Sequence, residues 1–175
     1  MKNIFLTLTL FFATAISAQV AIGKTSISSP AVSLEFYDNA DNTRGIILPW
    51  VTNTAAVTGA VNGTLVYNTA DKKIYVKYAS GWRDLSVDNT GAVNTTLQDS
   101  LTDQDSAKVL IGGDPATDTT PGILVLADTN KAMVLPKVAS PHLNIVNPSP
   151  GMMVYDTTRK QLAVFNGTVW SFWKP

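Results

Sequence analysis

The feature that most constrains the fold is an internal duplication. Four anchor segments recur in the same order in the two halves of the chain: Val-Ala-Ile-Gly at 20–23 recurs as Val-Leu-Ile-Gly at 109–112, Ile-Ile-Leu-Pro at 46–49 as Met-Val-Leu-Pro at 133–136, Gly-Thr-Leu-Val-Tyr-Asn-Thr at 63–69 as Gly-Met-Met-Val-Tyr-Asp-Thr at 151–157, and Ile-Tyr-Val at 74–76 as Leu-Ala-Val at 162–164. The paired segments start 89, 87, 88 and 88 residues apart. Four anchors that keep this order and spacing predict a tandem repeat, with repeat 1 at residues 19–86 and repeat 2 at residues 109–175.

Each repeat has about 67 residues, which is small for independent stability in a chain without cysteine. The repeats are therefore expected to need each other or other chains. Residues 87–108 between them are rich in Asn, Thr, Ser and Asp and are predicted to form a polar linker. Leu97 and Leu101 are four residues apart, which leaves open a short helix or a two-turn oligomer contact there.

The first 18 residues have the features of a secretory signal peptide. Lys2 supplies a positive start, an apolar run follows at 4–16, and Ile16-Ser17-Ala18 ends in a small residue before Gln19. This apolar run is shorter than the roughly 20 residues that a spanning helix needs, so no transmembrane segment is expected in the mature chain. The protein is expected to be exported and to be periplasmic, outer-membrane-associated or extracellular.

The local patterns predict a mostly β fold. In repeat 2, alternating segments at 152–155 and 161–165 and a third run at 168–173 are separated by turns, and Asn166-Gly167 favours a type I′ hairpin. Repeat 1 has the corresponding runs at 64–68, 73–78 and 82–85. Further strands are expected upstream at 32–37, 44–48, 122–127 and 132–135, with Pro49 and Pro136 ending the ladder after two of them. The expected architecture is two tandem small antiparallel β modules, each a three-stranded meander with extra strands, joined by the polar linker.

Charge and composition exclude several classes of function. Thirteen basic and thirteen acidic side chains give no net charge, which argues against a dedicated nucleic-acid binder. The absence of cysteine excludes disulfide and thiolate chemistry. His142 is the only histidine and lies between Pro141 and Leu143, so it is expected to be an ordinary loop residue rather than part of a triad or metal cluster.

The acidic residues do not form a recognised site either. Asp38 and Asp41 in one segment, and Asp103 and Asp105 in another, could supply oxygen ligands, but neither segment has the spacing of a calcium loop, and solvated turns are expected. Glu35 would have a raised pKa if it were buried, yet no partner is apparent, and a charge on an edge strand is the preferred interpretation. We therefore expect no enzyme activity, and no catalytic, metal-binding or cofactor-binding residue.

The aromatic residues are the candidate contacts with a partner or glycan. Trp82 and Trp170 occupy equivalent positions in the repeats, which favours packing across the meander. Trp50 and Trp173 have no aromatic counterpart in the other repeat and are better candidates for an exposed contact surface. The full set of candidate contact residues is Trp50, Trp170, Phe172 and Trp173.

The two repeats resemble a module common in secreted proteins of the bacteroidete group and in phage tail fibres. Its usual form is an initial V-G-I-G, then R-G-hydrophobic-L-P, and finally G-hydrophobic-V-Y-N-T followed by Y-N-G-T-x-W. The matches here are 22–23, 44–49, 63–69 and Trp82, and then 111–112, 135–136, 151–157 and 166–170, with Lys131-Ala132 replacing the usual Arg-Gly. The resemblance implies a structural or adhesive element of a surface appendage, frequently homotrimeric, and it supplies no catalytic residue.

Bacteria of this group O-glycosylate Asp-Ser and Asp-Thr sites after export. Four short segments of this kind place candidate glycosylation at Ser100, Ser106, Thr119 and Thr157. The first two lie in the polar linker, where access is easy.

The leading hypothesis is a non-enzymatic secreted or cell-surface protein that acts through protein–protein contacts as a fibre, appendage or outer-membrane-complex component. Its partners would be other copies of itself, possible trimers included, or a larger complex, through edge strands and the final run at 169–173. The alternative is a carbohydrate-binding, lectin-like module that uses exposed aromatic rings. A hydrolase is the least favoured class, because no positioned acid and base can be named.

Overall fold

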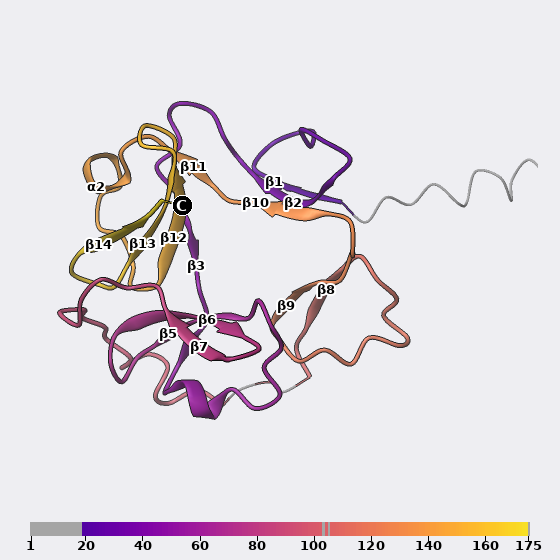
Figure 1. The fold of residues 1–175 in the computed structure, drawn as a ribbon, viewed down its shortest axis with the longest axis horizontal. Coiled ribbons are helices and arrows are strands. Elements are labelled where there is room, and N and C mark those ends of the chain that lie inside the picture. Colours follow the sequence, from indigo (N-terminus) through magenta and orange to yellow (C-terminus); the bar gives the residue numbers. More distant parts are fainter. Residues whose placement is uncertain (1–18, 103, 105, 175) are drawn as a thin grey trace, which may run out of the picture.

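The computed structural model describes residues 19–102, 104 and 106–174, and its fold is mostly β, as the sequence predicts (Figure 1). The predicted signal peptide at 1–18 lies outside the described residues. The elements are β1 (Val20–Ile22), β2 (Val32–Phe36), β3 (Ile46–Ile47), β4 (Trp50–Val51), the 3-10 helix η1 (Thr54–Ala56), β5 (Leu65–Asn68), β6 (Lys73–Tyr78), β7 (Gly81–Asp84), β8 (Val109–Ile111), β9 (Leu124–Leu126), β10 (Ala132–Val134), β11 (Lys137–Val138), the helix α2 (Pro141–Asn144), β12 (Met152–Asp156), β13 (Gln161–Phe165) and β14 (Trp170–Trp173). Within the described part of the chain, neither helix approaches the length and apolar character needed to cross a membrane.

Both repeats build the same two substructures. The first is a pair of parallel strands, β1 with β2 in repeat 1 and β8 with β9 in repeat 2. The second is a four-strand path in which a short parallel strand precedes an antiparallel meander, with order β4-β5-β6-β7 in repeat 1 and β11-β12-β13-β14 in repeat 2. The two predicted meanders are therefore confirmed.

The hairpin turn at Asn166-Gly167 differs from the sequence-based expectation. Strands β13 and β14 are joined by the four residues 166–169, and only Gly167 among them has a positive φ, so the turn is not a two-residue type I′ turn. The Asn166 side chain stabilises the longer loop, because its Oδ1 accepts hydrogen bonds from the N–H groups of Thr168 and Val169.

The repeats are interlocked rather than separate. Strand β3 of repeat 1 pairs antiparallel with β12 of repeat 2, and β10 of repeat 2 pairs in parallel with β2 of repeat 1. In Figure 1, β3 runs between the meander β5–β7 and the meander β12–β14. Gly45, directly before β3, permits this close approach, since any residue with a Cβ at that position would overlap the side chains of Met152 and Val154. The small size of each repeat is thus offset by a shared set of strand pairs.

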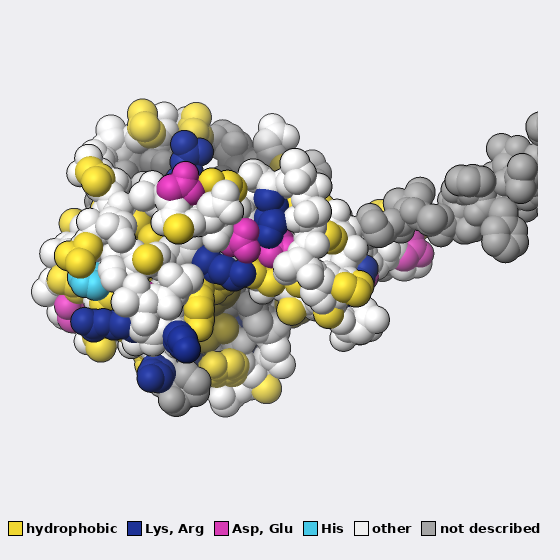
Figure 2. Space-filling model, turned by 90° about the horizontal axis from the view of Figure 1, so that it is seen from above, with side chains coloured by type: hydrophobic (Ala, Val, Ile, Leu, Met, Phe, Trp, Pro, Cys, Tyr) yellow, Lys and Arg dark blue, Asp and Glu magenta, His cyan; other side chains and the backbone are white. Residues whose placement is uncertain are grey.

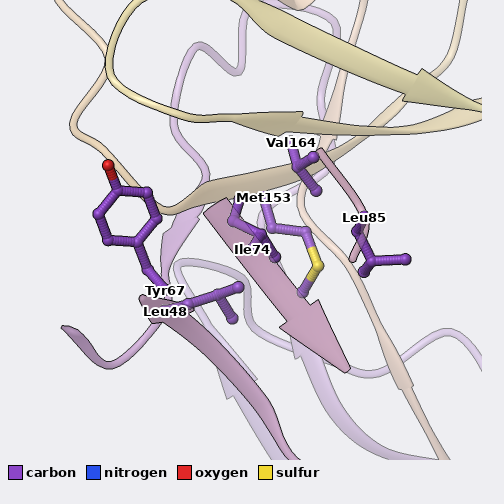
Figure 3. Close-up of a cluster of buried hydrophobic side chains, with 6 residues drawn as sticks. All are labelled: Leu48, Tyr67, Ile74, Leu85, Met153 and Val164. Atoms are coloured by element: carbon purple, nitrogen blue, oxygen red, sulfur yellow. The ribbon is translucent and has the colours of Figure 1, made fainter. Parts of the chain in front are cut away.

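One hydrophobic core draws on both meanders. Figure 3 shows its buried side chains between the strands, with the Tyr67 ring at one side of the group. They are Leu48, Tyr67, Ile74 and Leu85 from repeat 1 with Met153 and Val164 from repeat 2. A second cluster lies within repeat 2 and contains Val138, Ile145, Met152, Val154, Ala163 and Phe165. Burial against residues of the other repeat is the main physical reason to regard the two halves as one folding unit.

Tyr67 joins the two repeats by a buried polar contact. Its side chain is fully buried, and its hydroxyl donates a hydrogen bond of 2.7 Å to the carbonyl oxygen of Asn166. Desolvation, assisted by the negative charge of Asp71, raises the pKa of Tyr67 to about 12, so the hydroxyl stays a donor at neutral pH.

The first part of the linker packs on repeat 2. The N–H of Val87 bonds to Ser171 Oγ, Asp88 accepts from the Asn166 amide, and the carbonyl of Thr90 accepts from Thr168. Farther on, Leu97 and Leu101 are exposed. The chain there forms a single turn, in which the Asp99 N–H donates to the Thr95 carbonyl, rather than the short helix that the sequence left open. The linker is thus anchored at its start and solvated around Leu97 and Leu101.

We predict that Tyr67→Phe lowers the free energy of unfolding by about 1–3 kcal/mol, because the buried Asn166 carbonyl loses its donor while the ring volume stays. Urea unfolding followed by tryptophan fluorescence measures the change. Tyr78→Phe is the matched control, since Tyr78 is 45% exposed and should shift the midpoint little. Equal midpoints for the two variants would contradict the role assigned to the Tyr67 hydroxyl.

Candidate functional site

The four aromatic residues predicted to contact a partner are all half-buried in the structure. Trp50 lies in β4, and Trp170, Phe172 and Trp173 lie in β14, which is the outer strand of its sheet. Trp82, expected to be core with Trp170, is also half-buried. Each ring leaves only part of its surface to solvent, and its role as a contact for a partner or glycan stays a prediction.

Trp50 and Trp173 both use their indole N–H groups inside the molecule. Trp50 Nε1 donates to the Pro150 carbonyl at 2.9 Å, and its ring lies 6.1 Å from that of Tyr67. Trp173 Nε1 donates to the Leu85 carbonyl. Both bonds run from one repeat to the other, so these two tryptophans hold the repeats together.

Trp170 and Phe172 cover the second hydrophobic cluster. Trp170 packs on Phe165 with ring centroids 5.3 Å apart, and Phe172 meets the edge of His142 at 5.7 Å. His142 itself is exposed on the single turn of α2, where Pro141 is buried. This arrangement gives His142 a packing contact.

A cluster of charges forms where the repeats meet. Lys24 Nζ lies 2.8 Å from Glu35 Oε1 and 3.1 Å from Asp38 Oδ1, and Lys137 Nζ of repeat 2 lies 3.1 Å from Asp38 Oδ2. On the face seen in Figure 2, basic and acidic side chains accordingly lie next to one another rather than in separate patches. The sequence did not single out Lys24 or Lys137, since neither has a motif around it.

The expectation of Glu35 as a charge on an edge strand is wrong. Its side chain is fully buried in β2, which is the central strand between β1 and β10. Burial by itself raises the pKa of this carboxyl, but hydrogen bonds from the Lys24 ammonium and the Ser28 N–H outweigh burial and hold the pKa below its ordinary value. Hydrogen bonds from Lys24 and Lys137 likewise lower the pKa of Asp38. Both carboxylates are therefore ionised structural partners at neutral pH.

The segment 38–42 is held by internal bonds. Asp41 accepts from the Tyr37 hydroxyl, and the buried Asn42 amide donates to the carbonyls of Tyr37, Arg44 and Lys137. Asp103 and Asp105 lie outside the described residues. Among the residues that are described, no group of three or more His, Cys, Asp or Glu side chains could hold a metal ion.

All four candidate glycosylation residues are exposed. Ser100 and Ser106 lie in the linker, Thr119 lies in the loop before β9, and Thr157 follows β12. Thr157 stands next to the buried Asp156, whose Oδ1 accepts three backbone N–H groups. The hydroxyl positions are therefore accessible, and their modification stays a prediction.

Sequence reasoning missed the exposed apolar strand residues. Among hydrophobic side chains in strands or directly before them, five have the largest exposed fractions: Ile22, Ile47, Val109, Ile123 and Leu124. They belong to β1, β3, β8 and β9 or directly precede β9. Ile47 pairs with Met152 of the other repeat through its backbone, but its side chain is exposed like those of the other four residues.

Comparison with known proteins finds one family. A family model described as "Phage tail like trimerisation region" matches residues 114–174, which is most of repeat 2 and about a third of the chain. No curated protein and no solved structure matches the chain. Repeat 2 is thus similar to a phage tail-like trimerisation region, which fits a structural, homo-oligomeric protein that acts through protein–protein contacts.

We predict that acid weakens the fold through Glu35 and Asp38. Because their pKa values are lowered in the folded state, the stability that they contribute is present above the ordinary values of 4.5 and 3.8 and is lost as the pH falls through the folded values. Urea midpoints measured from pH 7 to pH 3 should fall over this window.

The variant Lys24→Met should remove about 3 kcal/mol at pH 7, since it leaves Glu35 buried without its cation. Lys108→Met is the control, because it breaks an exposed pair with Asp118 and should therefore cost much less stability. If both variants lose the same stability, the Glu35 pair is not a structural anchor.

Proposed function

We propose that this protein is a non-enzymatic, homotrimeric structural component of an exported fibre, appendage or outer-membrane-associated complex. The observation that carries the proposal is the similarity of residues 114–174 to a phage tail-like trimerisation region. The tail-fibre-like motifs occur in both repeats, so the same kind of contact is available twice in each chain.

The surface of the chain supports association. Apolar side chains of β1, β3, β8 and β9 are exposed, although each repeat has little apolar area to spare for its own core. Burying such residues against other copies would add stability that a chain of this size needs.

The buried and paired carboxylates support a structural role. Glu35 and Asp38 are engaged by lysines, and Asp156 caps three backbone N–H groups. Each of these acids therefore has a stabilising partner within the fold.

Export and adhesion complete the proposal. The signal-peptide pattern at 1–18 supports transport out of the cytoplasm, and the resemblance to surface modules supports attachment to a larger assembly. Glycans on Ser100 and Ser106 would protect the exposed linker.

We predict that the mature chain sediments as a trimer. Analytical ultracentrifugation over a range of concentrations should give a particle of three chains, because the proposed role requires self-association. A stable monomer at all concentrations would overturn the proposed function.

We also predict that the native protein begins at Gln19. Intact mass and N-terminal sequencing of protein from the producing cells should show removal of residues 1–18. Additional mass that maps to peptides with Ser100 or Ser106 would establish glycosylation, whereas an unprocessed N-terminus would contradict export by this signal.

A further inference from the structure

The two repeats have the same topology but different neighbours. One edge of β12 carries two strands, with β11 beside Tyr155 and Asp156 and β3 beside Met152 and Met153. The equivalent edge of β5 carries only β4, beside Tyr67 and Asn68. Within the described part of the chain, no strand pairs with the first half of this edge, where Leu65 occupies the position of Met153.

Proline explains why a second strand is needed on this edge. The N–H groups of Tyr67 and Tyr155 donate to the carbonyls of Pro49 and Pro136. The parallel ladder cannot continue to Leu65 or Met153, because proline has no N–H to donate. In repeat 2 the antiparallel strand β3 fills this gap by pairing Ile46 with Met153.

Burial shows that the gap in repeat 1 is open. Gly151 and Met152 are buried, whereas the equivalent Gly63 is exposed and Thr64 is half-buried. A Cβ added to Gly151 would meet Tyr67 and Trp50, but one added to Gly63 would meet no atom within 4 Å. The first half of β5 is therefore an exposed strand edge.

The parallel strand pairs β1–β2 and β8–β9 also differ in how they are covered. Here the covered edge belongs to repeat 1 and the open edge to repeat 2. Strand β2 lies between β1 and β10, whereas β9 pairs only with β8. Leu34 and Leu124 are equivalent, because they pair with Val20 and Val109 at the corresponding points. Leu34 is 1% exposed, but Leu124 is 47% exposed.

The covered edges are occupied by equivalent strands. Strands β3 and β10 precede the two prolines, and Ile46 and Met133 start the recurring segments. Strand β3 covers β12, and β10 covers β2. Each has one paired edge and one edge along which no other described strand lies.

We propose that the contact between repeat 1 and repeat 2 is repeated between molecules. Strand β10 of one molecule pairs with the open half of β5 in the next, and β3 of that next molecule pairs with β9 of the first. The occupant of both open edges is therefore a second copy of this chain. This inference rests on the proposed function and specifies which surface the oligomer uses.

Such a contact is heterologous, since different surfaces of the two molecules meet. It forms a closed ring when the rotation between molecules allows closure. The outer strands β7 and β14 offer edges as well. No described strand pairs with these edges in either repeat, so the contacts between the repeats do not indicate what would cover them.

The internal contact sets the expected register. Met153 pairs with Ile46 and Met152 with Ile47, so Leu65 should pair with Met133 and Thr64 with Val134 of the neighbouring molecule. The register of β3 on β9 follows from the internal pairing of Met133 with Leu34. It places Ile46 of one molecule opposite Leu124 of the other. Mostly apolar side chains would be buried at both places.

The two open edges of one molecule lie near each other. Thr64, before β5, and Gly122, before β9, line the same hollow of about 400 Å³. Ala132 takes the position that Gly45 has in the internal contact, and its methyl group would face Val66 and Thr64, the counterparts of Val154 and Met152. Thr64 is shorter than Met152, but Val66 is the same residue type as Val154, so the neighbouring strand must lie slightly farther from this end of the edge.

Engineered cysteines test the proposed register, because the chain has no cysteine of its own. Thr64 and Val134 correspond to Met152 and Ile47, which are a non-hydrogen-bonded pair because the N–H of the next residue, Leu48, bonds to the Gly151 carbonyl. Cα atoms of such pairs lie about 4.5 Å apart, within the range for a disulfide. Two single variants of the mature chain, Thr64→Cys and Val134→Cys, are mixed in urea, refolded together so that both enter the same oligomers, and oxidised.

The expected result is a disulfide-linked heterodimer on a non-reducing gel beside remaining monomer, because only contacts that place the two cysteines opposite each other can cross-link. Neither variant oxidised alone should give this product, nor should Thr64→Cys mixed with Tyr78→Cys, whose residue is exposed but lies away from the open edge. The double variant Thr64→Cys with Val134→Cys should close into a covalent ring with as many chains as the native oligomer.

The outcomes separate this inference from the proposed function. If the unmodified protein sediments as an oligomer but the mixed variants give no heterodimer, the strand register is overturned and the function stands. If the unmodified protein is a monomer and no heterodimer forms, both fail. Circular dichroism of the single variants confirms that they fold, so that absence of the product counts against the register.

Discussion

The exchange of strands next to two prolines is the constraint on which the rest of the structure depends. Pro49 and Pro136 each accept a bond from a meander strand but have no N–H with which to extend the ladder. The residues before Pro49 therefore pair with the other repeat, and β3 enters the sheet of β12. Gly45 permits the close approach, and this crossing brings the two meanders together around one core.

Polar contacts between the repeats reinforce this arrangement. The hydroxyl of Tyr67 and the indole groups of Trp50 and Trp173 each donate to a carbonyl of the other repeat. Lys137 of repeat 2 pairs with Asp38 of repeat 1. These bonds are made by side chains whose partners are 88 to 100 residues away, so loss of one repeat would leave buried groups of the other without partners.

Local features of the fold could be predicted from the sequence, whereas features that depend on distant partners could not. The meanders were predictable because alternation and turn residues act over a few neighbouring positions. The turn at Asn166 was predicted with the wrong geometry, because its side chain and carbonyl also bond to Asp88 and Tyr67. Glu35 was assigned to an edge because nothing near it in the chain indicates that β10 covers β2. Trp50 and Trp173 were singled out because they have no aromatic counterpart in the other repeat, but their bonds to the other repeat have no local signal.

The sequence by itself determined the duplication, the mostly β class and the two meanders, because repeated anchors and short-range periodicity are written along the chain. Only the tertiary structure decided that β3 covers β12 while the equivalent edge of β5 stays open, and that β10 covers β2 while β9 stays exposed. The physical reason is that strand pairing joins backbone groups, which every residue except proline has in the same form. Which distant segment pairs with an edge therefore depends on how the whole chain packs.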